Sequence, residues 1–139
     1  CGAHRDRHAF RTRRASGPRQ ALDQGADISF GAGGATGNGA LSAVAGDAGA
    51  LCVGVDSDQW FTVPEAHPCL VTSAMKLIDV GVAELIAQAH AGTMEGGNYF
   101  GEVGLAPHHD FDSMVTDEMR DTLAAVMAGV DDGSRTPMP

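Results

Sequence analysis

The sequence predicts an α/β fold in which a parallel sheet is flanked by helices. Short apolar runs alternate along the chain with segments of helical spacing, which is the pattern of strands joined by helical crossovers. The run at residues 51–55 is continuously apolar, as expected for a strand covered on both faces. The chain has 139 residues, of which 43% are hydrophobic, enough for one domain with its own core.

The first half of the chain alternates between the two kinds of element. Residues 19–25 predict the end of a helix closed by Gly25, and residues 28–30 predict a short buried strand. A glycine-rich turn at 31–39 leads into an alanine-rich helix at 40–48. The strand at 51–55 ends at Asp56, and residues 57–69, with two prolines, form a loop.

The second half predicts one more parallel strand and two helices. Residues 70–73 form the strand, and 77–90 an amphipathic helix because apolar residues recur at spacings of three and four: Ile78, Val82, Leu85, Ile86 and Ala89. Residues 98–105 are a strand or an extended segment. A second helix begins near Thr116, a suitable N-cap. Its apolar stripe is predicted to face the core and consists of Met119, Leu123, Val126, Met127 and Val130.

Charge divides the chain into two parts. Six arginines and one acid give residues 1–19 a net charge of +5, whereas three bases and 17 acids give residues 20–139 a net charge of −14. We therefore predict an arginine-rich, disordered or unmatched segment at 1–18 and a folded body at 19–139. A nucleic-acid arm is the alternative for the basic segment. The acidic body predicts no nucleic-acid partner, because it would repel phosphates.

The three cysteines have no spacing typical of a metal or redox site. Cys52 lies in an apolar run and is expected to be a small core residue, with a disulfide to Cys69 as the alternative. Cys1, followed by Gly2, resembles the lipid-carrying cysteine of a mature bacterial lipoprotein. No run of 18 or more apolar residues occurs, so the sequence predicts no membrane-spanning helix.

The candidate binding residues follow strands. In open α/β sheets ligands bind at the carboxyl ends of the strands, which here selects the turn after Phe30, Asp56, and the segment 73–76. Asp56 can accept two hydrogen bonds from adjacent hydroxyls such as those of ribose; its alternative role is to cap a loop. Asp58 is the less favoured candidate, because it lies further into the loop. Lys76 is the only lysine in the chain and can donate to ligand oxygens.

Gly33 and Gly34 complete the predicted binding site, and the sequence argues against a phosphate-binding loop, a metal site and a catalytic nucleophile. Gly33 and Gly34 would let a ligand approach the backbone closely, because no Cβ intervenes. Thr36 stands where a dinucleotide-binding turn needs glycine, and the turn has no Gly-Lys-Ser/Thr ending. Adjacent histidines at 108 and 109 point opposite ways in an extended segment, so they rarely share a metal. Ser73 lacks a nucleophile elbow. We therefore predict no cofactor, no metal and no enzymatic activity.

Four blocks occur in the order DQGADISFGAGGATGNGAL, VGVDSDQW, LVTSAMKLIDVGV and GGNYFGEVGLAPHHDFDSMV. Together they resemble the carboxy-terminal part of the basic membrane protein family, which includes purine-nucleoside-binding lipoproteins of ABC importers. The resemblance covers residues 19–139. It implies a type I periplasmic-binding-protein fold, with two α/β lobes and a ligand in the cleft between them. It also implies that this chain is an incomplete fragment that lacks the first lobe.

The resemblance implies a transport function and assigns roles to residues. Asp56 and Lys76 would hold the ribose hydroxyls of a purine nucleoside, and Gly33 and Gly34 would form the cleft wall. The parent protein would be extracytoplasmic, associated with the membrane through a lipid anchor, and would dock on the permease of an ABC importer. The alternative is a doubly wound α/β nucleotide-binding regulator or enzyme, which needs a phosphate loop or a nucleophile–base pair.

Overall fold

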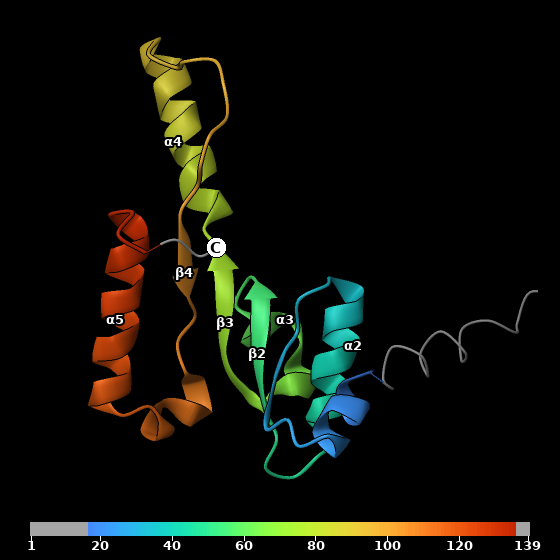
Figure 1. Cartoon of the computed structure of the whole chain (residues 1–139). Helices are drawn as coiled ribbons and strands as arrows, with labels where there is room; N and C mark the ends of the chain where they lie inside the picture. Colours follow the sequence, from blue (N-terminus) through green and yellow to red (C-terminus); the bar gives the residue numbers. More distant parts are fainter. Residues whose placement is uncertain (1–16, 136–139) are drawn as a thin grey trace, which may run out of the picture. The chain divides into compact units, whose positions relative to one another are not determined.

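A four-stranded sheet organises the part of the chain that ends at His109 (Figure 1). The computed structural model describes residues 17–135. The strands lie in the order β1 (Ile28–Phe30), β2 (Leu51–Asp56), β3 (Leu70–Lys76) and β4 (Val103–Leu105). The first three run parallel, and β4 pairs antiparallel with β3. The predicted α/β fold with a mostly parallel sheet flanked by helices is confirmed, and the arrangement is compatible with an incomplete α/β lobe.

The helices connect and extend these strands. A helix at residues 17–23 precedes β1. The remaining helical elements are α2 (Ala35–Val44), α3 (Gln59–Thr62), the 3-10 turn η1 (Pro64–Ala66), α4 (Ile78–Ala91), the 3-10 turn η2 (His109–Met114) and α5 (Asp117–Asp131). Helix α2 packs on β1 and β2, and α3 packs on β2 and β3. The chain divides into one compact unit that ends at His109 and a second that begins at Asp110.

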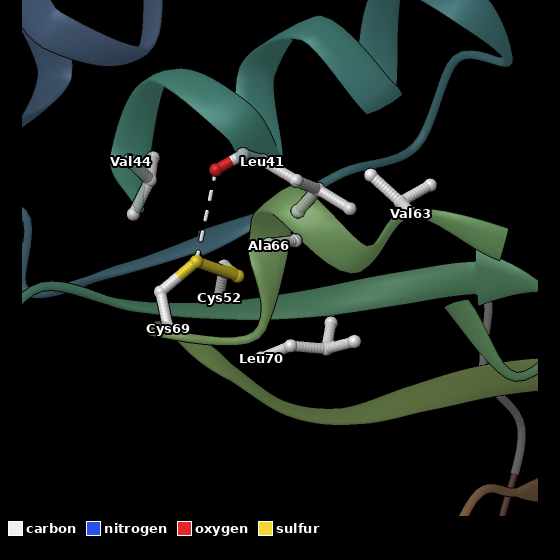
Figure 2. Close-up of a cluster of buried hydrophobic side chains, with 7 residues drawn as sticks. All are labelled: Leu41, Val44, Cys52, Val63, Ala66, Cys69 and Leu70. Carbon is white, nitrogen blue, oxygen red and sulfur yellow. Dashed lines mark hydrogen bonds between the residues drawn. A yellow bond between two sulfur atoms is a disulfide. The ribbon is translucent and has the colours of Figure 1, made fainter. Parts of the chain in front are cut away.

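The core of the first unit lies between α2, η1 and the strands β2 and β3 (Figure 2). Seven buried residues form it: Leu41, Val44, Cys52, Val63, Ala66, Cys69 and Leu70. Cys52 is a buried core residue as predicted, and it also forms the disulfide to Cys69 that the sequence left open, across 17 residues. Cys69 Sγ also lies 3.7 Å from the carbonyl oxygen of Leu41; because a disulfide sulfur carries no hydrogen, this is a packing contact.

Two predicted elements of the first half differ from the structure. Helix α2 begins at Ala35, five residues earlier than predicted, so it includes Gly37 and Asn38. Glycine lowers intrinsic helix propensity, but Gly37 is buried against the turn after β1 and this packing outweighs the propensity. Strand β1 was predicted to be buried. It lies at the sheet edge instead, and Phe30 is 57% exposed.

Helix α4 forms where predicted, but its apolar face is not buried. Ile78 and Ile86 are 63% and 65% exposed, and only Gly81 is buried within the helix. Gly92 ends the helix in the left-handed conformation that glycine adopts at low cost. The spacing of apolar residues therefore predicted the helix correctly, while the burial expected from that spacing does not occur among the described residues.

In the second unit, α5 begins as predicted at Thr116. The hydroxyl of Thr116 accepts a hydrogen bond from the Met119 backbone at 3.2 Å. Arg120 donates to the Asp112 carboxylate at 2.9 Å, which ties α5 to η2. The predicted burial of the apolar stripe is wrong, since Met119 is 54% exposed.

Some predictions fall outside the described residues. These are the lipid role of Cys1 and the character of residues 1–16. No helix among residues 17–135 is long and apolar enough to cross a membrane.

Candidate functional site

Asp56 and Lys76 meet at the carboxyl ends of neighbouring parallel strands. Each is the last residue of its strand, and Lys76 Nζ lies 2.7 Å from Asp56 Oδ1. The two side chains are 52% and 64% exposed. An exposed ion pair contributes at most about 1 kcal/mol to stability, so ligand hydroxyls can replace it at little cost. The sequence placed Lys76 just after a strand, but β3 continues to Lys76: Ala74 and Met75 pair with both β2 and β4, and Lys76 pairs with β4 alone.

The backbone at Asp56 is unusual. Its φ is 72°, one of two positive values among the described residues other than glycine. The backbone N–H of Ser57 donates to the Val55 carbonyl at 2.9 Å, so Asp56 is the central residue of a three-residue turn. Such turns with positive φ are rare and strained, and strain of this kind often accompanies binding sites. The carboxylate of this turn residue is the one that meets Lys76.

Gly33 and Gly34 precede α2 in the turn that follows β1. Both have positive φ, 135° and 55°, and Gly34 is the N-cap of α2. No heavy atom lies within 4 Å of a Cβ added at Gly34. Because β1 and β2 are parallel neighbours, this turn and Asp56 lie at the same edge of the sheet. The backbone there is open to solvent, as the predicted role requires.

Asp58 has a local structural role. Its carboxylate caps α3 by accepting from the Trp60 backbone at 3.1 Å, and it accepts from His109 Nε2 at 2.9 Å. Trp60 stacks between His67 and His109, with ring centroids 3.8 and 4.5 Å away. Asp58 is therefore engaged with this aromatic cluster rather than with Lys76. The sequence contained no signal for the pair of Asp58 and His109, because 51 residues separate them.

A buried polar network lies beneath the strand ends, and sequence reasoning missed its central residue, Gln59. The side-chain oxygen of Gln59 accepts from the Val55 backbone at 3.0 Å, and its amide nitrogen donates to Asn38 Oδ1 at 2.8 Å. The backbone N–H of Gln59 donates to Ser73 Oγ at 3.0 Å. Gln59 and Ser73 are 5% and 0% exposed. A polar residue in a proline-containing loop gave no indication of this burial.

An apolar cavity of about 350 Å³ adjoins Lys76. Its lining includes Lys76, Leu77, Val82, Leu85, Tyr99 and Val103. Tyr99 donates to Glu84 at 2.6 Å. This hydrogen bond, followed by burial and by the charges of Glu84 and Glu102, raises the pKa of Tyr99, so its hydroxyl remains a donor. Lys76 therefore pairs with an acidic residue and also lines this apolar cavity.

The site offers hydrogen-bond donors and acceptors for binding. Asp56 supplies carboxylate oxygens, Lys76 supplies N–H donors, and the turn at Gly33 supplies backbone groups. Among residues 17–135, no group of three or more histidines, cysteines or acids is arranged to hold a metal ion. Ser73 is buried and bonded to Gln59, a geometry in which it holds the backbone in place.

Fold and site together define an α/β protein with polar side chains at the carboxyl edge of a mostly parallel sheet, the edge at which such sheets bind ligands. Among solved structures, the chain is similar to a transcriptional activator of the comK gene from Bacillus halodurans, with a TM-score of 0.69 and 19% identity. The similarity covers 86% of this chain and 41% of that one. At this identity the likeness shows the fold alone. No protein-family model and no curated protein matches the chain.

These comparisons correct several predictions. The resemblance to the basic membrane protein family is overturned, because no family model or curated protein supports it and the similar structure is described as a transcriptional activator. The same finding contradicts the description as an ABC-importer lipoprotein, the permease partner and the exclusion of nucleic acid. The physical reason is that a short apolar strand followed by a turn and a helix recurs in many unrelated α/β proteins, so blocks of this kind do not identify a family. The alternative prediction, an α/β regulator, agrees better with the comparison.

Proposed function

We propose that this chain is the ligand-sensing part of an α/β regulator, and that it binds a small molecule with two adjacent hydroxyls between Asp56 and Lys76. Its role is binding rather than catalysis. The observation that supports the proposal is the 2.7 Å approach of Lys76 Nζ to Asp56 Oδ1 at the carboxyl edge of the sheet. A carboxylate can accept from both hydroxyls of a diol while an ammonium group donates to their oxygens. The similar structure is described as an activator of transcription, which favours a regulatory setting for such a site.

Because the chain has a single lysine, ligand binding at the site can be followed by NMR through that one side chain. Lys76 is the only lysine, so selective 13C,15N-lysine labelling gives one side-chain signal in NMR spectra. We expect this signal to shift on titration with methyl β-D-ribofuranoside and to shift much less with the 2-deoxy compound. Asp56→Asn is expected to weaken ribofuranoside binding about 10- to 100-fold, because hydrogen bonds to a charged group contribute about 1.5–3 kcal/mol.

Asp47→Asn is the matched control for this variant. Asp47 is exposed and lies before the amino end of β2, at the opposite edge of the sheet from Asp56. Binding by the control should equal that of the unmodified protein. Equal binding of the ribofuranoside and its 2-deoxy analogue, or full binding by Asp56→Asn, would refute the proposed diol site.

The arginine-rich segment supports nucleic-acid contact as a second candidate function. Residues 1–19 contain six arginines and one acid. If all six arginines contact DNA phosphates, the logarithm of the binding constant should fall against the logarithm of the salt concentration with a slope of about −5. We expect fluorescence anisotropy with a 20-base-pair duplex to show such a slope, and replacement of Arg5, Arg7 and Arg11 by Gln to reduce it by about 3. Binding that is independent of salt and of these substitutions would exclude this function.

The disulfide bears on the cellular location, which was predicted to be extracytoplasmic. Disulfides persist in oxidising compartments and are rare in the cytosol. The bond between Cys52 and Cys69 therefore supports our proposal that the folded body senses its ligand outside the cytoplasm; contact with nucleic acid, the second candidate function, would instead place the chain in the cytoplasm. Thiol trapping with a maleimide immediately after lysis should leave both cysteines unlabelled. Labelling of both under native redox conditions would favour a cytosolic regulator.

A further inference from the structure

Gln59 forms hydrogen bonds with each of the three elements that carry or adjoin the candidate site residues. It is the first residue of α3 and is 5% exposed. Its side-chain oxygen holds the backbone N–H of Val55, the residue directly before Asp56, at 3.0 Å. Its backbone N–H holds Ser73, three residues before Lys76 in β3, at 3.0 Å. Its amide nitrogen holds Asn38, in the helix that follows Gly33 and Gly34, at 2.8 Å.

The neighbours fix the orientation of the Gln59 amide. A backbone N–H only donates, so the oxygen of the amide must face Val55, and the NH₂ group is left for Asn38 Oδ1. Space for the arrangement comes from Gly54, where an added Cβ would lie 2.5 Å from Ser73 Oγ and 2.8 Å from Gln59 Oε1. Buried hydrogen bonds of this kind are strong and directional, because water does not compete for the partners.

The Asp56 and Lys76 side chains do not fix their own positions, since both are more than half exposed. The backbone before Asp56, where φ becomes positive, is held by the buried amide. We propose that Gln59 is the positioning residue of the ligand site, which sets the carboxylate of Asp56 and the ammonium group of Lys76 at the spacing that a diol requires. This inference rests on the proposed function.

Gln59→Glu tests the role without a change of size. The introduced group, when protonated, can accept from Val55 and donate to Asn38 as the amide does. When ionised it has no donor left for Asn38 Oδ1. Burial raises the pKa of a carboxyl group, so ionisation is expected between about pH 6 and 8, where exposed carboxylates are already charged. Asn38 and Ser73, whose side chains form hydrogen bonds with Gln59, do not titrate.

The measurements are the NMR signal of Lys76 and the affinity for methyl β-D-ribofuranoside at pH 6 and pH 8, with folding checked by circular dichroism. We expect the variant to resemble the unmodified protein at pH 6. At pH 8 the Lys76 signal should move towards that of Asp56→Asn, and affinity should fall about tenfold. The exposed Gln24 gives the matched control, Gln24→Glu, which should follow the unmodified protein at both pH values.

A second variant covers the case in which Gln59→Glu unfolds at pH 8. Ser73→Ala removes only the acceptor of the Gln59 backbone N–H, and it should shift the Lys76 signal in the same direction with the protein folded. An unchanged Lys76 signal and unchanged affinity in both folded variants would overturn the positioning role. If the unmodified protein does not distinguish the ribofuranoside from its 2-deoxy analogue, the proposed function fails, and the Lys76 signal still tests Gln59.

Discussion

Replacing Cys52 and Cys69 with alanine is expected to lower the free energy of unfolding by about 3 kcal/mol or more. The disulfide closes a loop across 17 residues, and a cross-link of that length restricts the unfolded chain by about 3 kcal/mol. Both sulfurs are also fully buried in the core of the first unit, so the substitution removes packing as well. Urea unfolding followed by circular dichroism measures the change.

The cross-link and the packing can be measured separately. A background with Cys1→Ser leaves only the two core cysteines. In this background, the oxidised protein, the reduced protein and the double-alanine variant are compared. The reduced protein keeps the sulfur atoms and loses only the covalent bond, so its stability should lie between the other two. Equal stability of the oxidised and reduced proteins would contradict a stabilising disulfide.

Gly37→Ala should destabilise the protein by about 3 kcal/mol. Gly37 is buried in the first turn of α2, and a Cβ there would overlap the carbonyl oxygen of Gly31. The atoms that this Cβ would meet belong to the backbone of Gly31 and Ala32, so they cannot rotate away as a side chain could. Overpacking in a buried region typically costs 1–3 kcal/mol, and the rigid neighbour places this case at the upper end. Thermal or urea unfolding gives the value directly.

Gly46→Ala is the matched control for this substitution. The nearest atom to an added Cβ at Gly46 is the Ala43 carbonyl oxygen at 3.5 Å, an ordinary contact, and its φ is not positive. The control should change stability by no more than about 0.5 kcal/mol. Similar stability of the two variants would show that α2 can move away from the turn after β1, and that the close approach is not needed.

The placement of Asp56 and Lys76 at one edge of the sheet could be predicted, because it follows from strand topology alone. Strands that run parallel bring their carboxyl ends to one edge, and two short apolar runs were enough to bring Asp56 and Lys76 together. The antiparallel β4 had no such signal. Its pairing with β3 depends on how the chain returns after α4, and Lys76, which pairs with β4 alone, could not be recognised as strand until that partner was known.

Other parts of the site depend on contacts between residues that are distant in the sequence, and the residues next to them give no sign of these contacts. Helix α2 begins in a glycine-rich segment because Gly37 is packed against backbone, and tertiary packing of this kind outweighs propensity. Gln59 is buried because three partners from different elements converge on it. His109 pairs with Asp58 across 51 residues. Neither periodicity nor composition contains information about such partners.

The sandwich of Trp60 between His67 and His109 has an optical consequence. Trp60 is the only tryptophan in the chain, so all indole emission comes from a ring with an imidazole on each face. An indole ring that loses a stacking partner exposes that face to water, so the emission of Trp60 depends on whether both imidazole rings are in contact with it. The protein thus carries a built-in fluorophore whose brightness reports whether the segment at His109 is in contact with α3, without any added dye.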